Sequence, residues 1–116
     1  MLLASIWGLP AHAADISWSG ASGSNWSTAG NWIGGAAPGS TDTAVLNGTG
    51  SIRIANQSVT LNAFSLATSL ADTTRLTISG GGRLTVALGV IGATGGSGSV
   101  VVSGPGSMLT NTSEIT

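Results

Sequence analysis

The sequence predicts an all-β fold, namely a parallel β-solenoid with rungs of about 24 residues. Three observations predict it: short runs in which apolar and polar residues alternate, recurrence of these runs at a fixed interval, and composition. Charged residues make up 6% of the 116 residues, the net charge is −1, and cysteine is absent. The chain is nevertheless rich in Val, Ile, Leu and Thr, unlike disordered segments. Stacked strands with small polar side chains fit this composition.

Strands are indicated wherever apolar residues occupy every second position between glycines and serines, because this period buries one face of a strand. No segment keeps the period of about 3.6 residues that a helix requires, so we expect no helix beyond the N-terminal segment. The apolar pairs are Ile52/Ile54, Val59/Leu61, Leu76/Ile78, Leu84/Val86 and Val100/Val102.

The strands recur at an offset of 24 residues, which carries Leu76 onto Val100 and marks a repeat architecture. Glycine at equivalent places predicts corners, where the chain needs positive φ. The phase is imperfect, because the offset of 24 residues places Val59 and Leu61 one position before Leu84 and Val86. The further matches at this offset are Ile52 and Ile54 with Leu76 and Ile78, Phe64 and Leu66 with Leu88 and Val90, and Ser79, Gly80 and Gly82 with Ser103, Gly104 and Gly106.

A β-sandwich is the alternative architecture, since short strands with glycine turns serve that fold too. The identical Ser-Gly-x-Gly sequences at residues 79–82 and 103–106 favour the solenoid. We therefore divide the chain into an N-terminal segment of residues 1–14, a Trp-rich cap or first rung over 15–47, and solenoid repeats over 48–116.

Residues 1–14 resemble the end of a secretory signal peptide. A short apolar run leads to Ala11-His12-Ala13, a small-x-small cleavage pattern, so we expect cleavage after Ala13 or Ala14. A helix or strand that stays in the fold is the alternative. No Lys or Arg precedes the apolar run, which indicates a signal that begins further upstream. The run is too short to span a membrane as a helix.

The most distinctive local feature is the tryptophan segment, residues 18–32, which contains Trp18, Trp26 and Trp32. Large aromatic side chains bury much area, so we expect these three to cap the open N-terminal end of the solenoid. Stacking on sugar rings is the alternative. Asp42 follows Pro38-Gly-Ser-Thr and is expected to bond nearby backbone amides in a turn.

The pattern of Trp18, Asn25-Trp26, Asn31-Trp32, Gly34-Gly35, Pro38 and Asp42 resembles the start of bacterial autotransporter passengers. The resemblance implies a right-handed parallel β-helix, exported through the Sec system and carried across the outer membrane by a C-terminal β-barrel translocator. The chain stops at Thr116 in mid-rung, so we expect a fragment of such a passenger. Its location would be the bacterial cell surface, the outer membrane or the medium.

Catalysis is not expected. After the signal the chain has no His, Lys or Cys, so a serine nucleophile lacks a base, and we expect no metal and no cofactor. The carboxylates Asp15, Asp42, Asp72 and Glu114 are not separated by one repeat. Sparse cations exclude a binding surface for nucleic acid.

The expected function is that of a non-catalytic surface segment or adhesin, with a host or surface glycan or protein as partner. The alternative is a secreted carbohydrate-binding or carbohydrate-active β-helix.

Overall fold

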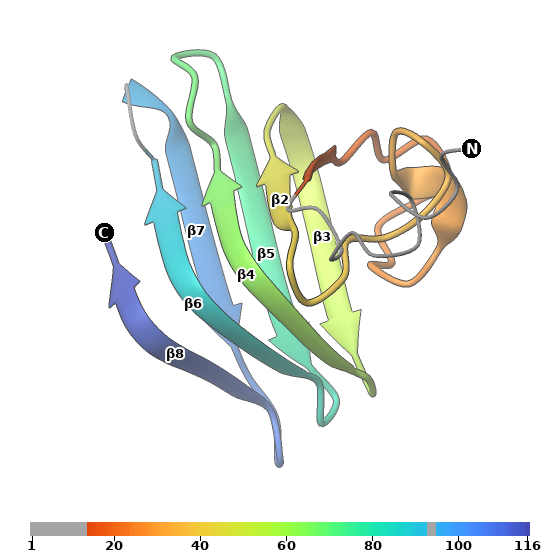
Figure 1. Cartoon of the computed structure of the whole chain (residues 1–116), viewed down its shortest axis with the longest axis vertical. Helices are drawn as coiled ribbons and strands as arrows, with labels where there is room; N and C mark the ends of the chain where they lie inside the picture. Colours follow the sequence, from red (N-terminus) through yellow and green to blue (C-terminus); the bar gives the residue numbers. More distant parts are fainter. Residues whose placement is uncertain (1–13, 93–94) are drawn as a thin grey trace, which may run out of the picture.

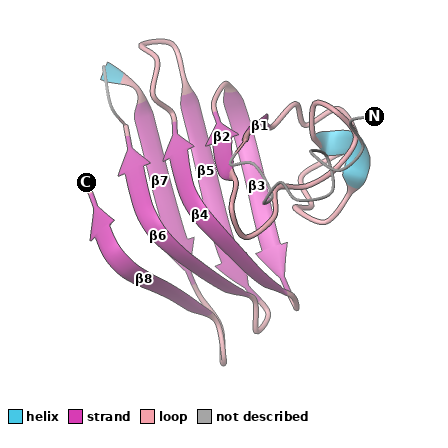
Figure 2. Ribbon diagram, in the orientation of Figure 1, coloured by secondary structure: helices cyan, strands magenta, loops and turns pink. Residues whose placement is uncertain are grey.

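The computed structural model describes residues 14–92 and 95–116. It is a β-solenoid of about four turns, built from two facing sheets (Figure 1, Figure 2). The five-stranded sheet has the order β1 (Asp15–Ser17), β2 (Thr43–Leu46), β4 (Ser58–Leu66), β6 (Arg83–Ile91) and β8 (Met108–Ile115). The three-stranded sheet has the order β3 (Thr49–Ala55), β5 (Thr73–Ser79) and β7 (Ser97–Val102). A short 3₁₀ helix, η1, covers Ala29–Asn31.

Neighbouring strands in both sheets of the described chain are parallel. The predicted solenoid is therefore confirmed, and the β-sandwich alternative is wrong because sandwich sheets are antiparallel. In Figure 1 the chain ascends the nearer, five-stranded sheet and descends the farther one as it advances from β3 to β8. The coil is thus right-handed, as expected for crossovers between parallel strands.

The two sheets repeat with different intervals. In the three-stranded sheet, Thr49 pairs with Thr73 and Thr73 with Ser97, which is the predicted offset of 24 residues. In the five-stranded sheet, Val59 pairs with Leu84 and Leu84 with Leu109, one residue more. The difference arises at the corner between the sheets, which lengthens from residues 56–57 through 80–82 to 103–107. This explains the imperfect phase of the sequence repeat.

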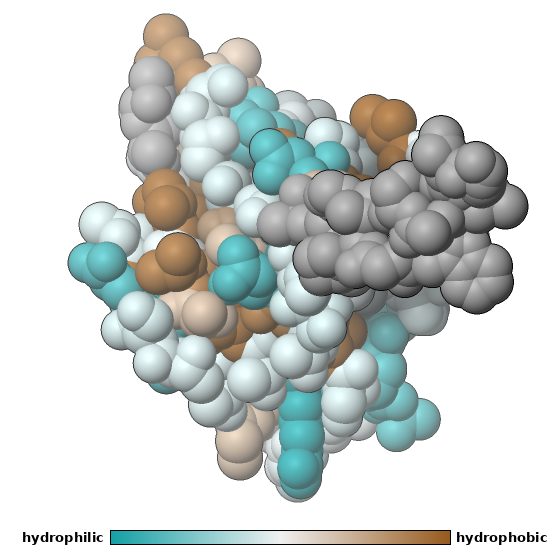
Figure 3. Space-filling model, in the orientation of Figure 1, coloured by the Kyte–Doolittle hydropathy of each residue, from teal (hydrophilic) through white to brown (hydrophobic). Residues whose placement is uncertain are grey.

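One predicted alignment is wrong. Phe64 and Leu66 pair with Gly89 and Ile91, whereas the uniform offset had placed them on Leu88 and Val90. Because side chains alternate across a strand, a slip of one residue moves a side chain to the other face. Leu88 and Val90 accordingly point outward, with exposed fractions of 43% and 36%. Figure 3 shows apolar patches among the polar ones on this face of the molecule.

The predicted glycine corners are confirmed. Gly80 and Gly81 have φ values of 58° and 81°, and Gly104 and Gly106 have 87° and 78°. These values lie in the region that glycine enters without the steric cost of a Cβ. At the first of these corners Asn56 adopts a φ of 53°, a conformation that asparagine tolerates better than most residues.

The core lies between the sheets and consists of columns of stacked side chains. Every apolar pair predicted between residues 52 and 86 points inward and is buried. Val100 is half-buried, while Val102 in the last rung is exposed. The arginines point outward and are exposed, as residues that solubilise the faces should be; they are Arg53, Arg75 and Arg83. The fully or nearly fully buried aliphatic and aromatic side chains are Ala44, Leu46, Ile52, Ile54, Leu61, Phe64, Leu66, Ala67, Leu76, Ile78, Leu84 and Val86.

The strands of the five-stranded sheet bend in their middle. In β4 the buried positions change from Val59 and Leu61 to Phe64 and Leu66, which skips one residue of strict alternation. The pairing of β6 with β8 shifts register at the equivalent place. There the amide of Asn111 donates to the carbonyls of Val86 and Ala87, at 3.3 and 3.1 Å. Such side-chain bonds satisfy backbone groups that an irregular ladder leaves unpaired.

Candidate functional site

The tryptophan segment lies at the N-terminal end of the solenoid and covers the edges of both sheets there. On one side it follows directly on β1, which pairs with β2, and the backbone N–H of Trp18 donates to the carbonyl of Val45 in β2 at 2.9 Å. On the other, the N–H of Trp26 donates to the carbonyl of Arg53 at 2.9 Å, and the N–H of Arg53 donates to the carbonyl of Ser24 at 2.7 Å. The segment therefore continues the backbone pairing of both sheets over a short distance.

The three tryptophans differ in exposure. Trp26 and Trp32 are each only 2% exposed and belong to the core, whereas Trp18 is half-buried. The ring of Trp32 lies between the other two, with centroid distances of 5.0 Å to Trp18 and 4.7 Å to Trp26, both in edge-to-face geometry. Its indole N–H donates to the carbonyl of Trp26 at 2.8 Å. Trp26 and Trp32 are therefore inaccessible to a ligand, and Trp18 is the tryptophan of this segment that a ligand can reach.

Asn31 holds the loop of the tryptophan segment together, a role that the sequence reasoning missed. It is fully buried. Its side chain accepts from the N–H of Ser22 at 2.6 Å and donates to the carbonyl of Asn25 at 3.0 Å. Buried amides need such partners because an unpaired polar group in the interior costs free energy. The repeated Asn-Trp dipeptide was the available signal, since asparagine readily bonds nearby backbone groups.

Asp42 lies in the turn that leads into β2. Its carboxylate accepts from the N–H of Gly39 at 2.7 Å and from the N–H of Ala14 at 3.2 Å. The carbonyl of Ala14 in turn accepts from the N–H of Thr43 at 2.8 Å. Asp42 thus connects the turn to the first described residue of the chain. Of the two expected cleavage positions, Ala13 lies outside the described residues.

Asp72 is the second carboxylate that accepts hydrogen bonds from backbone N–H groups. The sequence had indicated no role for it. It is 9% exposed and ends the loop between β4 and β5. Its two oxygens accept from the N–H of Gly48 at 2.8 Å, one rung below, and from the N–H of Ser69 at 3.0 Å. The side chain therefore ties two successive rungs together at the corner.

We expect Asp72→Ala to lower the free energy of unfolding by about 2–4 kcal/mol, because two backbone N–H groups lose a charged acceptor. Asp72→Asn should lose less, since the amide oxygen can still accept one bond. Urea unfolding followed by circular dichroism measures both. Asp15→Ala is the control, because Asp15 is exposed and exposed substitutions typically change stability by at most about 0.5 kcal/mol. Equal effects at the two positions would contradict the role of Asp72.

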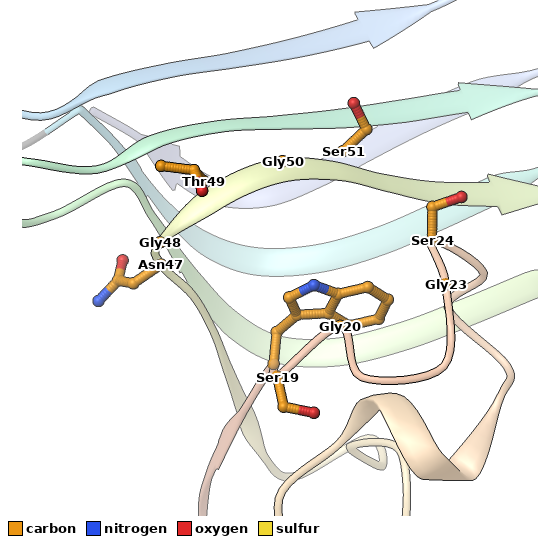
Figure 4. Close-up of a pocket in the computed structure, with 10 residues that line it drawn as sticks. Ser19, Gly20, Gly23, Ser24, Asn47, Gly48, Thr49, Gly50 and Ser51 are labelled. Atoms are coloured by element: carbon orange, nitrogen blue, oxygen red, sulfur yellow. The ribbon is translucent and has the colours of Figure 1, made fainter.

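A groove with a volume of about 500 Å³ lies between the tryptophan segment and the beginning of β3. Figure 4 shows the loop of Ser19, Gly20 and Gly23 on one side and residues from Gly48 to Ser51 on the other. Trp18 also lines the groove. A Cβ on Gly20 would lie 3.0 Å from the indole nitrogen of Trp18, so the loop backbone passes close to the N–H edge of the ring. All the lining residues are uncharged.

The carboxylates are dispersed. Asp15 begins β1, Asp42 precedes β2, Asp72 precedes β5, and Glu114 lies near the end of β8. Within residues 14–92 and 95–116, no group of three or more His, Cys, Asp or Glu side chains is placed to hold a metal ion. In the same part of the chain, no helix has the length and apolar character needed to cross a membrane.

The fold and these sites define a β-solenoid with a tryptophan-lined N-terminal end. Comparison with known proteins yields no match for the chain, whether with family models, with curated proteins or with solved structures.

Proposed function

We propose that the chain is a non-catalytic structural segment of an exported, autotransporter-like surface protein. The observation that carries this proposal is the position of the tryptophan segment, which covers both sheet edges directly after the apolar N-terminal run. A solenoid needs a cover over its terminal rung, because an open edge pairs with other chains. Where the coil begins, the tryptophan segment supplies such a cover.

The outer faces of the coil support a scaffold or adhesive role. Thr60, Thr85 and Thr110 stack on one another on the outside of the five-stranded sheet. On the three-stranded sheet, Thr49, Thr73 and Ser97 form a second ladder of hydroxyl groups. Ordered ladders of hydroxyl groups offer hydrogen bonds to a glycan or protein partner.

The position of Ala14 sharpens the proposed processing. Both its N–H and its carbonyl are bonded to residues at the start of β2, so cleavage after Ala14 would remove two hydrogen bonds from the fold. We therefore propose cleavage after Ala13. The new α-amino group of Ala14 would then lie beside the carboxylate of Asp42, where a charge-assisted hydrogen bond is stronger than one to a neutral amide.

Expression of the whole reading frame in a Gram-negative bacterium, with cell fractionation and N-terminal sequencing, tests this proposal. We expect the protein outside the cytoplasm with Ala14 as its first residue. Ala11→Arg is the control, because it disrupts the small-x-small pattern and should leave the chain uncleaved. Retention in the cytoplasm with the bond between Ala13 and Ala14 uncleaved would contradict the proposal.

Carbohydrate binding is the second candidate function. The observation that favours it is the groove beside Trp18, whose lining combines an accessible indole with small polar residues.

A further inference from the structure

We infer that the groove beside Trp18 is a binding site for a neutral saccharide. Its volume of about 500 Å³ falls in the range of about 300–1,000 Å³ that is usual for small-molecule sites. This inference rests on the second candidate function, carbohydrate binding, and deepens it by naming the class of ligand. It does not depend on the proposed scaffold role or on export.

The aromatic surface of the groove is provided by Trp18 alone among the three tryptophans of the segment. Trp26 and Trp32 are each 2% exposed, whereas Trp18 is half-buried and lines the groove. The position of its ring is preset by the edge-to-face contact with Trp32, whose ring centroid is 5.0 Å away. The backbone N–H of Trp18 donates to the carbonyl of Val45 at 2.9 Å, which fixes the main chain from which the ring extends. A preorganised aromatic face binds the apolar face of a sugar ring with little loss of side-chain freedom.

The opposite wall offers backbone hydrogen-bonding groups. Arg53 uses its N–H and carbonyl on the outer edge of β3, toward Ser24 and Trp26. Successive residues of a strand direct these groups to alternate edges, so Thr49 and Ser51 present theirs on the same edge as Arg53. That edge faces the groove. Sugar hydroxyls both donate and accept, which matches a mixture of N–H and carbonyl groups.

The chemistry of the lining selects against charged ligands. All the lining residues are uncharged, so an acidic sugar or a phosphate would lose its hydration without gaining an ionic partner. The hydroxyl of Thr49 adds a side-chain donor and acceptor at the rim, where the residue is exposed.

The length of the free edge selects against a peptide strand. The bridge between Asn25 and Arg53 closes the edge of β3 at one end, and the strand begins at Thr49. The few residues left between them are fewer than strand addition normally pairs, since strands have a usual length of about five or six residues. A compact ligand therefore fits the groove better than an extended chain.

Isothermal titration of the chain tests the site, with cellohexaose, maltohexaose and N-acetylchitohexaose as neutral probes. We expect at least one of them to bind. Trp18→Phe should weaken that binding about three- to tenfold through the loss of stacking surface. Thr49→Val should weaken it by a similar factor through the loss of one hydroxyl.

Thr73→Val is the matched control, because Thr73 stands directly above Thr49 in the same exposed ladder but does not line the groove. It should bind like the unmodified chain. Unfolding curves establish that each variant is folded. The inference is overturned if none of the three probes binds, or if binding is unchanged in both Trp18→Phe and Thr49→Val. It is also overturned if the uncharged peptide acetyl-Thr-Val-Thr-Val-Thr-amide binds in their place.

Discussion

Phe64→Ala is expected to lower the free energy of unfolding by about 3–5 kcal/mol, the usual cost of deleting a buried aromatic ring. Phe64 is 1% exposed and stands in a column between Ala44 below and Gly89 above. Two small neighbours leave room for one large ring. A Cβ on Gly89 would lie only 2.8 Å from the ring of Phe64, so Gly89→Ala should itself cost about 1–3 kcal/mol through overpacking.

A double-mutant cycle measured by urea unfolding separates these effects. In the Phe64→Ala background the added methyl group of Gly89→Ala enters the space that the ring has left. There the second substitution should be neutral or stabilising. Phe64→Leu is a milder variant that keeps the cycle measurable if Phe64→Ala does not fold. Equal costs of Gly89→Ala in both backgrounds would contradict the pairing of Phe64 with Gly89 and favour the uniform 24-residue offset.

Trp32→Ala is the second substitution for which we expect a large effect, about 3–5 kcal/mol. Its ring is the central one of three and is 2% exposed. The substitution should also accelerate amide hydrogen exchange in β2 and β3, because the backbone that pairs with their outer edges loses the ring that packs it onto the core. Trp32→Phe keeps a ring but leaves the carbonyl of Trp26 without its donor, at a cost of about 1–3 kcal/mol.

Trp18→Ala serves as the comparison. Because Trp18 is half-buried, its removal should destabilise the chain less than removal of Trp32. The combination that supports both assignments is a large loss of stability for Trp32→Ala and a loss of saccharide binding for Trp18→Phe. If Trp18→Ala destabilised the chain as much as Trp32→Ala, the division between a structural and an accessible tryptophan would be wrong.

Local sequence patterns were sufficient to predict the strands of the three-stranded sheet. Ile52 and Ile54 stack on Leu76 and Ile78 as expected, because the segments that form these strands recur at a constant interval. The corner glycines were equally predictable, since Gly80 and Gly81 follow a strand and adopt positive φ.

The other sheet was less predictable, because the length of each corner and the bend in each strand change its register. A corner that grows by one residue leaves no strong signal in composition, yet it moves Leu88 out of the predicted alignment with Phe64 and onto the surface. Phe64 was matched to the wrong residue for this reason. The complementary sizes of Phe64 and Gly89 become evident only once the strands are paired.

The candidate site was likewise predictable from the sequence only in part. The sequence marked residues 18–32 as distinctive, but three similar tryptophans could not be ranked without their burial. Asn31 was missed although its partners Ser22 and Asn25 are near it in the chain, because the sequence does not show that its side chain is buried. Asp72 was missed because one of its partners, Gly48, lies a whole rung away.

By itself, then, the sequence determined the all-β class, the repeat of about 24 residues, the glycine corners and the distinctive N-terminal segment. These features depend on residue spacing and on backbone preferences, which act locally. Only the tertiary structure decided the register of the five-stranded sheet, the partner of Phe64, the role of Asp72 and the accessibility of Trp18. Each of these depends on which residues of one rung stand above those of another, and that is determined by packing across the whole coil.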